Sequence, residues 1–223
     1  MKQIDIIIPT RNRWKKLERC LESIPREISD ITLNVIVICD GDYETAQRLM
    51  ASSDGLVGQV FFVRKQRGSV FCRNLATQCA EDAVLYATDD IEFNPGAIEM
   101  AVKAMMKHFP DEDGIIGFNQ IGKHHFSKTG VALVGQKFLR RYPNRKLFCP
   151  LYFHFSCQEI ERLGDSINRL HLEKAAKLIH YHPSFNHKEA DKTHIEARAY
   201  RYKDRKVSVD RRAKNLIWGD VKE

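Results

Sequence analysis

The chain has 223 residues, 43% hydrophobic content and a formal net charge of +7, from 36 basic and 29 acidic residues. This composition excludes a disordered chain and suits one sizeable domain. No apolar run reaches the ~18 residues of a membrane span, and the first residues do not form a signal peptide. We therefore expect a cytoplasmic protein whose positive charge suits phosphate-bearing partners.

The first half of the chain alternates strands and helices. Continuous apolar runs predict buried strands at 4–8, 33–39, 60–63, 83–87 and 115–118, with helices between them. One of these helices should begin at Pro95, with Asn94 as its cap, and end at Met106. Such alternation predicts right-handed βαβ units in a mostly parallel α/β sheet.

The second half is less regular. Strands are expected at 131–134 and 176–182, with an aromatic stretch at 150–155 between them. From 186 onward the chain is polar and helix-forming, with 11 basic and 7 acidic residues. Six cysteines are scattered without a CxxC pair, which favours reduced thiols over disulfides or a metal cluster.

Polar loops follow three of the expected strands. They are Pro9-Thr10-Arg11, Asp40-Gly41-Asp42 and Thr88-Asp89-Asp90. The carboxyl ends of parallel strands share one edge, where open α/β sheets bind ligands. From the residues alone, the Asp89-Asp90 pair is either an acidic turn before a helix or a divalent metal site shared with phosphates. Arg11 and Arg73 are suited to phosphates.

Other nucleotide motifs are missing from the sequence. No GxGxxG follows the first strand, which argues against a dinucleotide site, and no GxxxxGK[ST] motif of a P-loop occurs.

Four segments in order resemble the family 2, GT-A-type glycosyltransferases. They are Ile4 to Arg13, Val37 to Gly41, Arg67 to Asn74 and Leu85 to Pro95. The segment Tyr86-Ala87-Thr88-Asp89-Asp90 further resembles the spore-coat polysaccharide branch of that family. The resemblance implies a GT-A-like sheet flanked by helices, with a less regular acceptor-side half and a basic helical tail.

The same resemblance implies the domain organisation and the activity. Residues 1–185 would form one domain, with a nucleotide-sugar-binding half at 1–110 and an acceptor or catalytic half at 111–185. Residues 186–223 would be a basic helical extension. The activity would be inverting transfer of a hexose or pentose from a nucleoside-diphosphate sugar, with UDP- or dTDP-sugars favoured. The acceptor hydroxyl would belong to a polysaccharide, a glycolipid or a modified nucleic acid.

Residue roles follow from the resemblance. Asp40 would bind the base, and Asp89 the ribose or the sugar side. Asp90 would hold Mn²⁺ or Mg²⁺ on the diphosphate, which stabilises the leaving group as a Lewis acid. The remaining substrate-binding candidates are Pro9, Thr10, Arg11, Arg13 and Arg73.

The base that takes the acceptor proton is less well marked. The family pattern leads us to expect an acidic segment after the aromatic stretch, but Cys157 stands at the expected Asp position. Glu159 is the nearest carboxylate and Asp165 the next, so both are candidate bases. The alternative is that Glu159 has no catalytic role and simply lies at the start of a helix.

A histidine is a further candidate ligand for the metal at Asp90. His180 and His182 face the same way on a strand, and His182 at the strand end could bind the metal or the diphosphate. The segment Asp191 to His194 could cover the site as a flap.

Two other functions stay open at this stage. A nucleotidyltransferase could use the same acids on a nucleoside triphosphate, and Cys157 with the basic tail would also suit a non-catalytic binding protein. The mixed basic and aromatic stretch 198–206 is either a solvated helix face or a surface for nucleic acid or membrane.

Overall fold

A computed structural model gives the structure of the protein and describes residues 1–52, 55–122, 127–183 and 191–220. The strands are β1 Gln3–Thr10, β2 Thr32–Asp40, β3 Val57–Val63, β4 Ala83–Tyr86, β5 Ile91–Phe93, β6 Ile115–Ile121, β7 Ala132–Val134 and β8 Leu170–His180. The helices are α1 Trp14–Glu22, α2 Tyr43–Ala51, α3 Ser69–Thr77, α4 Ala97–His108, α5 Gln136–Leu139, α6 Cys157–Ser166 and α7 Lys192–Ala213, with a 3₁₀ turn at Pro143–Arg145.

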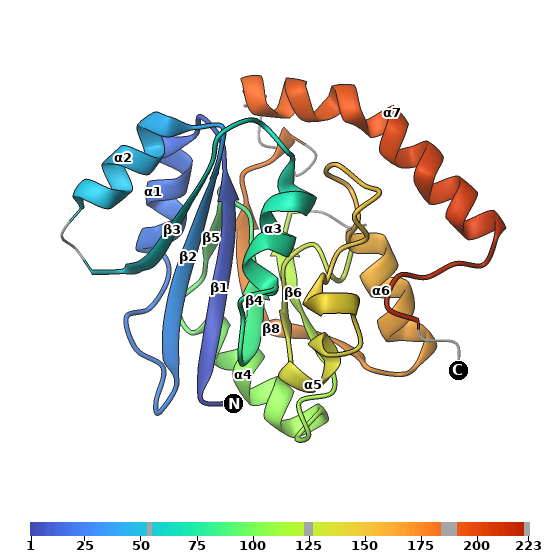
Figure 1. Ribbon diagram of the computed structural model, residues 1–223. Coiled ribbons are helices and arrows are strands. Elements are labelled where there is room, and N and C mark those ends of the chain that lie inside the picture. Colours follow the sequence, from blue (N-terminus) through green and yellow to red (C-terminus); the bar gives the residue numbers. More distant parts are fainter. Residues whose placement is uncertain (53–54, 123–126, 184–190, 221–223) are drawn as a thin grey trace.

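The strands form one sheet in the order β3-β2-β1-β4-β7-β6-β8-β5 (Figure 1). The strands β1 to β4 pair in parallel, as the alternating first half predicts. In the second half β7 runs antiparallel to β4 and β6, and β5 runs antiparallel to β8. The antiparallel pairs need no crossover helix, which explains why the alternation fades there.

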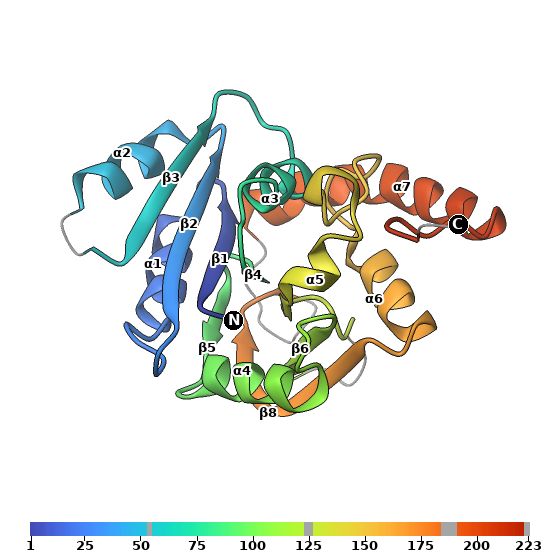
Figure 2. The same ribbon diagram turned by 60° about the horizontal axis from the view of Figure 1, so that its bottom comes forward.

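Helices cover both faces of the sheet. The central strands are buried on both sides, so their alternate residues enter two cores. Ile6 and Ile8 join the core under α1, α2 and α4, while Ile7 joins the core under α3, α5 and α6. Figure 2 shows α1 and α2 on one side of β1 to β3 and α3 on the other.

Several element boundaries differ from the prediction, those of α4 and β8 among them. Helix α4 begins at Ala97, because Asn94, Pro95 and Gly96 form a turn in which the Asn94 carbonyl accepts from the Ala97 N–H. Gly96 has φ +78°, a conformation that glycine adopts without strain. Strand β8 starts at Leu170, earlier than expected, since it pairs along β6 as well as β5, and it ends at His180.

The six cysteines are free thiols, as predicted from their spacing. Among the described residues, no helix is both long and apolar enough to cross a membrane.

Candidate active site

The loops after β1 and β4 meet at the carboxyl edge of the sheet. The side chains of Asp89 and Asp90 are 5% and 4% exposed. The Thr10 hydroxyl donates to Asp89 over 2.9 Å, and Arg13 Nη1 lies 2.9 Å from Asp89 and 3.4 Å from Asp90. The prediction that the loops after β1 and β4 lie together is therefore confirmed.

Asp90 is flanked by histidines from two distant elements. His180 Nε2 lies 3.3 Å from Asp90 Oδ1, and His194 Nε2 lies 3.2 Å from Asp90 Oδ2. The His182 ring lies 4.6 Å from the His194 ring, centroid to centroid. The register that pairs Ile91 with His180 brings β8 beside Asp90, and α7 contributes His194 from its first turn.

The two acids are held in different electrostatic environments. Burial raises the pKa of Asp89, although Arg13 partly offsets the effect. Burial acts in the same direction on Asp90, but hydrogen bonds from His180 and His194 outweigh it and hold the pKa of Asp90 well below its usual range. The surroundings therefore favour the charged form of Asp90 more strongly than that of Asp89.

The donor set around Asp90 fits a divalent cation shared with a ligand. Within the described residues no three carboxylate, imidazole or thiol groups already converge on one point in a way that would hold a metal. Mg²⁺-type sites usually take one or two carboxylates plus substrate phosphates, not a cage built by protein alone. Burial lowers the pKa of His182 to about 4, so this imidazole is neutral at pH 7, the form that binds metals.

Asp40 ends β2 at the same edge but faces a loop. Its carboxylate accepts from the backbone N–H groups of Arg67 and Gly68, over 2.7 and 2.8 Å, and is 5% exposed. Arg11 Nη1 donates to the Asp40 carbonyl over 3.0 Å, so the loops after β1 and β2 are joined as well. The sequence did not reveal that Asp40 orders the 67–68 loop.

The remaining predicted substrate-binding residues border the same space. Pro9 and Arg73 line a cleft of about 1310 Å³ together with Arg13, Asp89 and Asp90. Arg73 is 6% exposed and donates to the Ala87 carbonyl over 3.0 Å. Its Nε has no hydrogen-bond partner in the described part of the protein. A buried unpaired donor is costly, which favours a ligand at this position.

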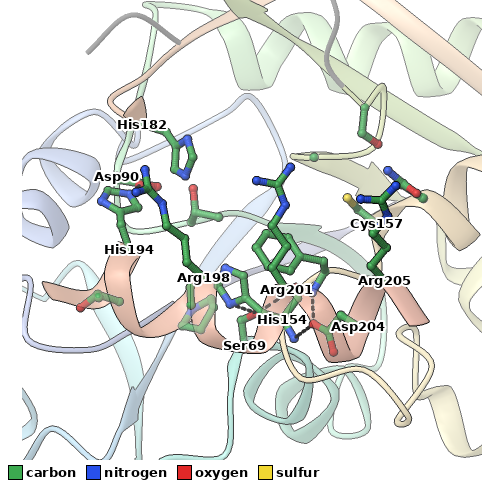
Figure 3. Close-up of a pocket in the computed structure, with 18 of the residues that line it drawn as sticks. Ser69, Asp90, His154, Cys157, His182, His194, Arg198, Arg201, Asp204 and Arg205 are labelled. Carbon is green, nitrogen blue, oxygen red and sulfur yellow. Dashed lines mark hydrogen bonds and ion pairs between the residues drawn. The ribbon is translucent and has the colours of Figure 1, made fainter. Parts of the chain in front are cut away.

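Helix α7 forms one wall of the cleft. Its lining residues run from Thr193 to Arg212, and Cys157 and Gln158 at the start of α6 lie on another wall. In Figure 3, Asp90, His182 and His194 gather at one end of the view, with Arg205 and Cys157 at the other and Arg201 between them. The cleft therefore extends from the acidic strand end along α7.

The structure places Glu159 outside this cleft. Both of its oxygens bind Arg211, over 2.6 and 2.9 Å, and it also accepts from the Tyr152 hydroxyl and the Trp218 N–H. Burial opposes its charge, but these bonds bring the pKa of Glu159 below the ordinary value. It does not line the cleft, so acting as the base would require leaving this network.

Asp165 is also away from the cleft. It lies at the end of α6, 48% exposed, and pairs with Lys128 over 3.0 Å. Cys157, at the expected Asp position, does line the cleft, but burial raises its pKa and keeps it a neutral thiol. The structure thus brings neither predicted carboxylate to the acidic strand end.

His154 is a cleft-lining group that the sequence did not single out. Its Nδ1 lies 3.0 Å from the Ser69 hydroxyl, which also contacts the His154 carbonyl at 3.3 Å. Burial, with Arg73 nearby, lowers the pKa of His154 to about 4, so the ring is neutral. Asp204 of α7 orders this segment by accepting from the N–H groups of residues 153–155.

His180 and His194 are the other residues that the sequence analysis left out of the site. The period-two pair His180 and His182 gave a signal, but it did not say which ring reaches Asp90. His194 belongs to the segment 191–194 that was expected to cover the site as a flap, but no local pattern showed that its ring contacts Asp90, 104 residues away in sequence.

Comparisons with known proteins agree with this fold. The model of the family "Glycosyl transferase family 2" matches residues 5–160. The chain therefore belongs to glycosyl transferase family 2, as its motifs indicated. A search of curated protein sequences finds no match.

Solved structures show the same fold at low sequence identity. TarS of S. aureus, residues 1–349, superposes with a TM-score of 0.59 at 15% identity, over 76% of this chain and 57% of TarS. GalNAc-T7 with UDP, GalNAc and Mn²⁺ gives 0.61 at 13% identity, over 81% of this chain and 44% of that one. A mannosyltransferase of Pyrobaculum calidifontis with GDP-Man and Mn²⁺ gives 0.58 at 15%, over 79% and 56%.

These matches confirm the GT-A-like α/β fold. The chain spans just over half the length of the TarS fragment it matches. The resemblance to the spore-coat branch and the domain limits at 110 and 185 stay predictions.

Proposed function

We propose that the protein is a metal-dependent, inverting glycosyltransferase that uses a nucleoside-diphosphate sugar. The observation that carries the proposal is the joining of Asp40, Thr10, Asp89 and Asp90 at one sheet edge, where Asp89 and Asp90 line the cleft. Family membership and the nucleotide and Mn²⁺ named for two of the matched structures support it.

Residues at the strand ends would bind different parts of the donor. We assign the base side to Asp40, whose oxygens keep lone pairs beyond the two backbone bonds. Asp89 would bind the ribose or sugar side, while Pro9, Thr10, Arg11 and Arg13 would shape this end of the cleft. Arg73, with its unpaired Nε, would meet an anionic part of the donor.

Asp90 would hold the cation together with a histidine of its cluster. His182 was the predicted partner, and His180 and His194 are the rings in contact with Asp90. A bound divalent ion would offset the charge of the leaving diphosphate there. UDP- and dTDP-sugars stay the favoured donors.

Inversion would proceed in one displacement. The acceptor oxygen bonds to the anomeric carbon, the bond from that carbon to the diphosphate oxygen breaks, and the diphosphate leaves with the electron pair. The acceptor proton passes to a base. Glu159 and Asp165 are the bases proposed from sequence, and the cleft position of His154 adds that imidazole as a third candidate.

Titration of UDP with and without Mn²⁺ tests the donor site. We expect binding that requires Mn²⁺ and that Asp90→Asn removes. Asp111→Asn is the matched control, because Asp111 is an exposed aspartate paired with Lys137. Binding that is equal with and without the metal, or unchanged in Asp90→Asn, would refute the assignment.

The reaction itself is tested by incubating the protein with a panel of sugar nucleotides. Release of the nucleoside diphosphate is expected even with water as acceptor, and pyrophosphate release from nucleoside triphosphates would instead indicate a nucleotidyltransferase. The variants Glu159→Gln, Asp165→Asn and His154→Gln then separate the bases. Loss of turnover with unchanged UDP binding identifies the base among them.

A further inference from the structure

Arginines are sorted onto one face of α7. The helix contains five arginines and three lysines. Arg198, Arg201, Arg205 and Arg212 line the cleft, whereas the lysines at 192, 203 and 206 are not among the residues lining it. At 3.6 residues per turn, these four arginines fall within an arc of about 60° and extend over about 21 Å. We call them the arginine stripe.

The fifth arginine has a separate role. Arg211 is 13% exposed and bound to Glu159, so it anchors the helix to α6. If the charges of α7 served only solvation, lysines and arginines would be expected on the cleft side and on the solvent side alike. The sorting therefore calls for a reason specific to the cleft.

Little of the charge on the stripe is neutralised by protein. Arg198, Arg201 and Arg205 have no ion pair or hydrogen bond among the described residues, and Arg212 contacts only the neutral Gln158, at 3.1 Å. The acids that line the cleft are engaged elsewhere: Asp89 and Asp90 with Arg13, and Asp204 with three backbone N–H groups. The stripe is thus left for a negatively charged ligand.

The stripe starts at the proposed transfer site and leads away from it. Arg198 lies one turn after His194, which contacts Asp90, and Arg205 lies on the side of Cys157 (Figure 3). Arg212, further along α7, contacts Gln158. One donor nucleotide at the strand ends would not need anionic contacts over this whole length. A second ligand that binds along α7 would need such contacts.

We propose that the arginine stripe is the acceptor subsite and that the acceptor is a glycan chain carrying phosphate groups. Arginine is the residue suited to such groups, because its planar fork donates two parallel hydrogen bonds to a phosphate. Phe155 and Tyr202, exposed at 42% and 82%, border the cleft and offer apolar faces to the rings or carbons between phosphates. This inference rests on the proposed transferase function.

Binding of linear inorganic polyphosphate, a probe that presents phosphates alone, tests the stripe. We expect titration calorimetry at ~0.15 M salt to show binding that the double variant Arg201→Gln/Arg205→Gln weakens roughly tenfold or more, since two charge-assisted contacts are lost. The matched control Lys203→Gln/Lys206→Gln removes the same charge from the same helix off the stripe, and should bind nearly as the unchanged protein does.

Four outcomes would overturn the proposal. Equal weakening in both double variants would mean diffuse attraction, and no binding to the unchanged protein would mean that no phosphate subsite exists. Displacement of polyphosphate by UDP with Mn²⁺ would assign the stripe to the donor. Tighter stripe-dependent binding of a single-stranded DNA with the same number of phosphates would indicate a nucleic-acid acceptor.

The test is independent of sugar transfer. Polyphosphate binding through the stripe in a protein that turns over no sugar nucleotide would refute the proposed function and leave an anion site. Turnover of a sugar nucleotide without polyphosphate binding would support the proposed function and refute the arginine stripe as a phosphate-binding acceptor subsite.

Discussion

Asp90 and Glu159 are two buried carboxylates that look alike until their neighbours are compared. Their side chains are 4% and 5% exposed and each lies beside an arginine; sequence reasoning made Asp90 a metal ligand and Glu159 a candidate catalytic base. Asp90 also borders the cleft and two imidazoles, whereas Glu159 is enclosed by Arg211, Tyr152 and the Trp218 N–H. Burial and an arginine partner are therefore common to both carboxylates, and the remaining neighbours distinguish the one that borders the cleft from the one that is enclosed by protein.

The variant Asp90→Asn should give the largest effect. It keeps the size of the side chain but removes the charge that would hold a divalent ion. We expect sugar-nucleotide turnover to fall by roughly 10²- to 10⁴-fold, as loss of several kcal/mol of charge stabilisation implies. A discontinuous assay of released nucleoside diphosphate measures it, and a thermal melt of the same sample verifies folding. Turnover close to that of the unchanged protein would remove Asp90 from the site.

Glu159→Gln should act on stability. Breaking the Glu159–Arg211 pair leaves a mostly buried guanidinium without its counter-charge. We expect the free energy of unfolding to fall by about 3 kcal/mol, measured by urea denaturation.

The double variant Glu159→Gln/Arg211→Met supplies the control for this comparison. Removing both charges should recover part of the lost stability, because no charge is then left buried and unpaired. Full stability with no turnover in Glu159→Gln alone would instead make Glu159 the catalytic base and reverse the comparison.

A pH series sharpens the same contrast. The pKa of Glu159 in the folded protein is lowered from 4.5, so the folded state favours the charged form. Its contribution to stability is therefore complete above that ordinary value and is lost as pH falls through the lowered pKa. The stability difference between the unchanged protein and Glu159→Gln should shrink below pH 4.5 in urea titrations. A constant difference across this range would show that the charge of Glu159 is not involved.

Asp165→Asn should have the smallest effect. Asp165 and Lys128 are 48% and 42% exposed, and exposed pairs contribute little because water screens them. We expect a change within about 0.5 kcal/mol in the free energy of unfolding, and turnover like that of the unchanged protein. A large loss of turnover would show that α6 moves Asp165 into the cleft during the reaction.

The sequence predicted the features that depend on local pattern. Strand β1, strand β2 and the acidic end of β4 are signalled by continuous apolar runs and by polar residues just after them. The resemblance to family 2 rests on these same segments, which explains why the family and the fold were confirmed. The turn at Asn94 to Gly96 was missed, because proline at a helix start and proline in a turn look the same in sequence.

The contacts that the sequence did not reveal join residues far apart in the chain. Arg211 lies 52 residues from Glu159 and His194 lies 104 from Asp90, so no local pattern reports either pair. A carboxylate near the expected catalytic segment looks the same in sequence whether its partner is an acceptor hydroxyl or a distant arginine. The role of α7 as a cleft wall was likewise invisible, although the basic character of the segment was not.

The attachment of α7 has a consequence for how the protein opens. Its buried side chains are His194 and Asp204, and its two ends are tied by charge, through Asp191 to Arg13 and through Arg211 to Glu159. The strands beneath it are instead held by an apolar core that salt does not weaken. Amide protons of α7 should therefore exchange with solvent through local release, faster at high ionic strength, while those of β1 and β2 wait for global unfolding. The Tyr200 ring stacks on Phe153 and Val207 packs against the core, but the buried groups of α7 are polar and its ends are held by ion pairs. Releasing α7 should therefore uncover the cleft at a lower cost than unfolding the domain.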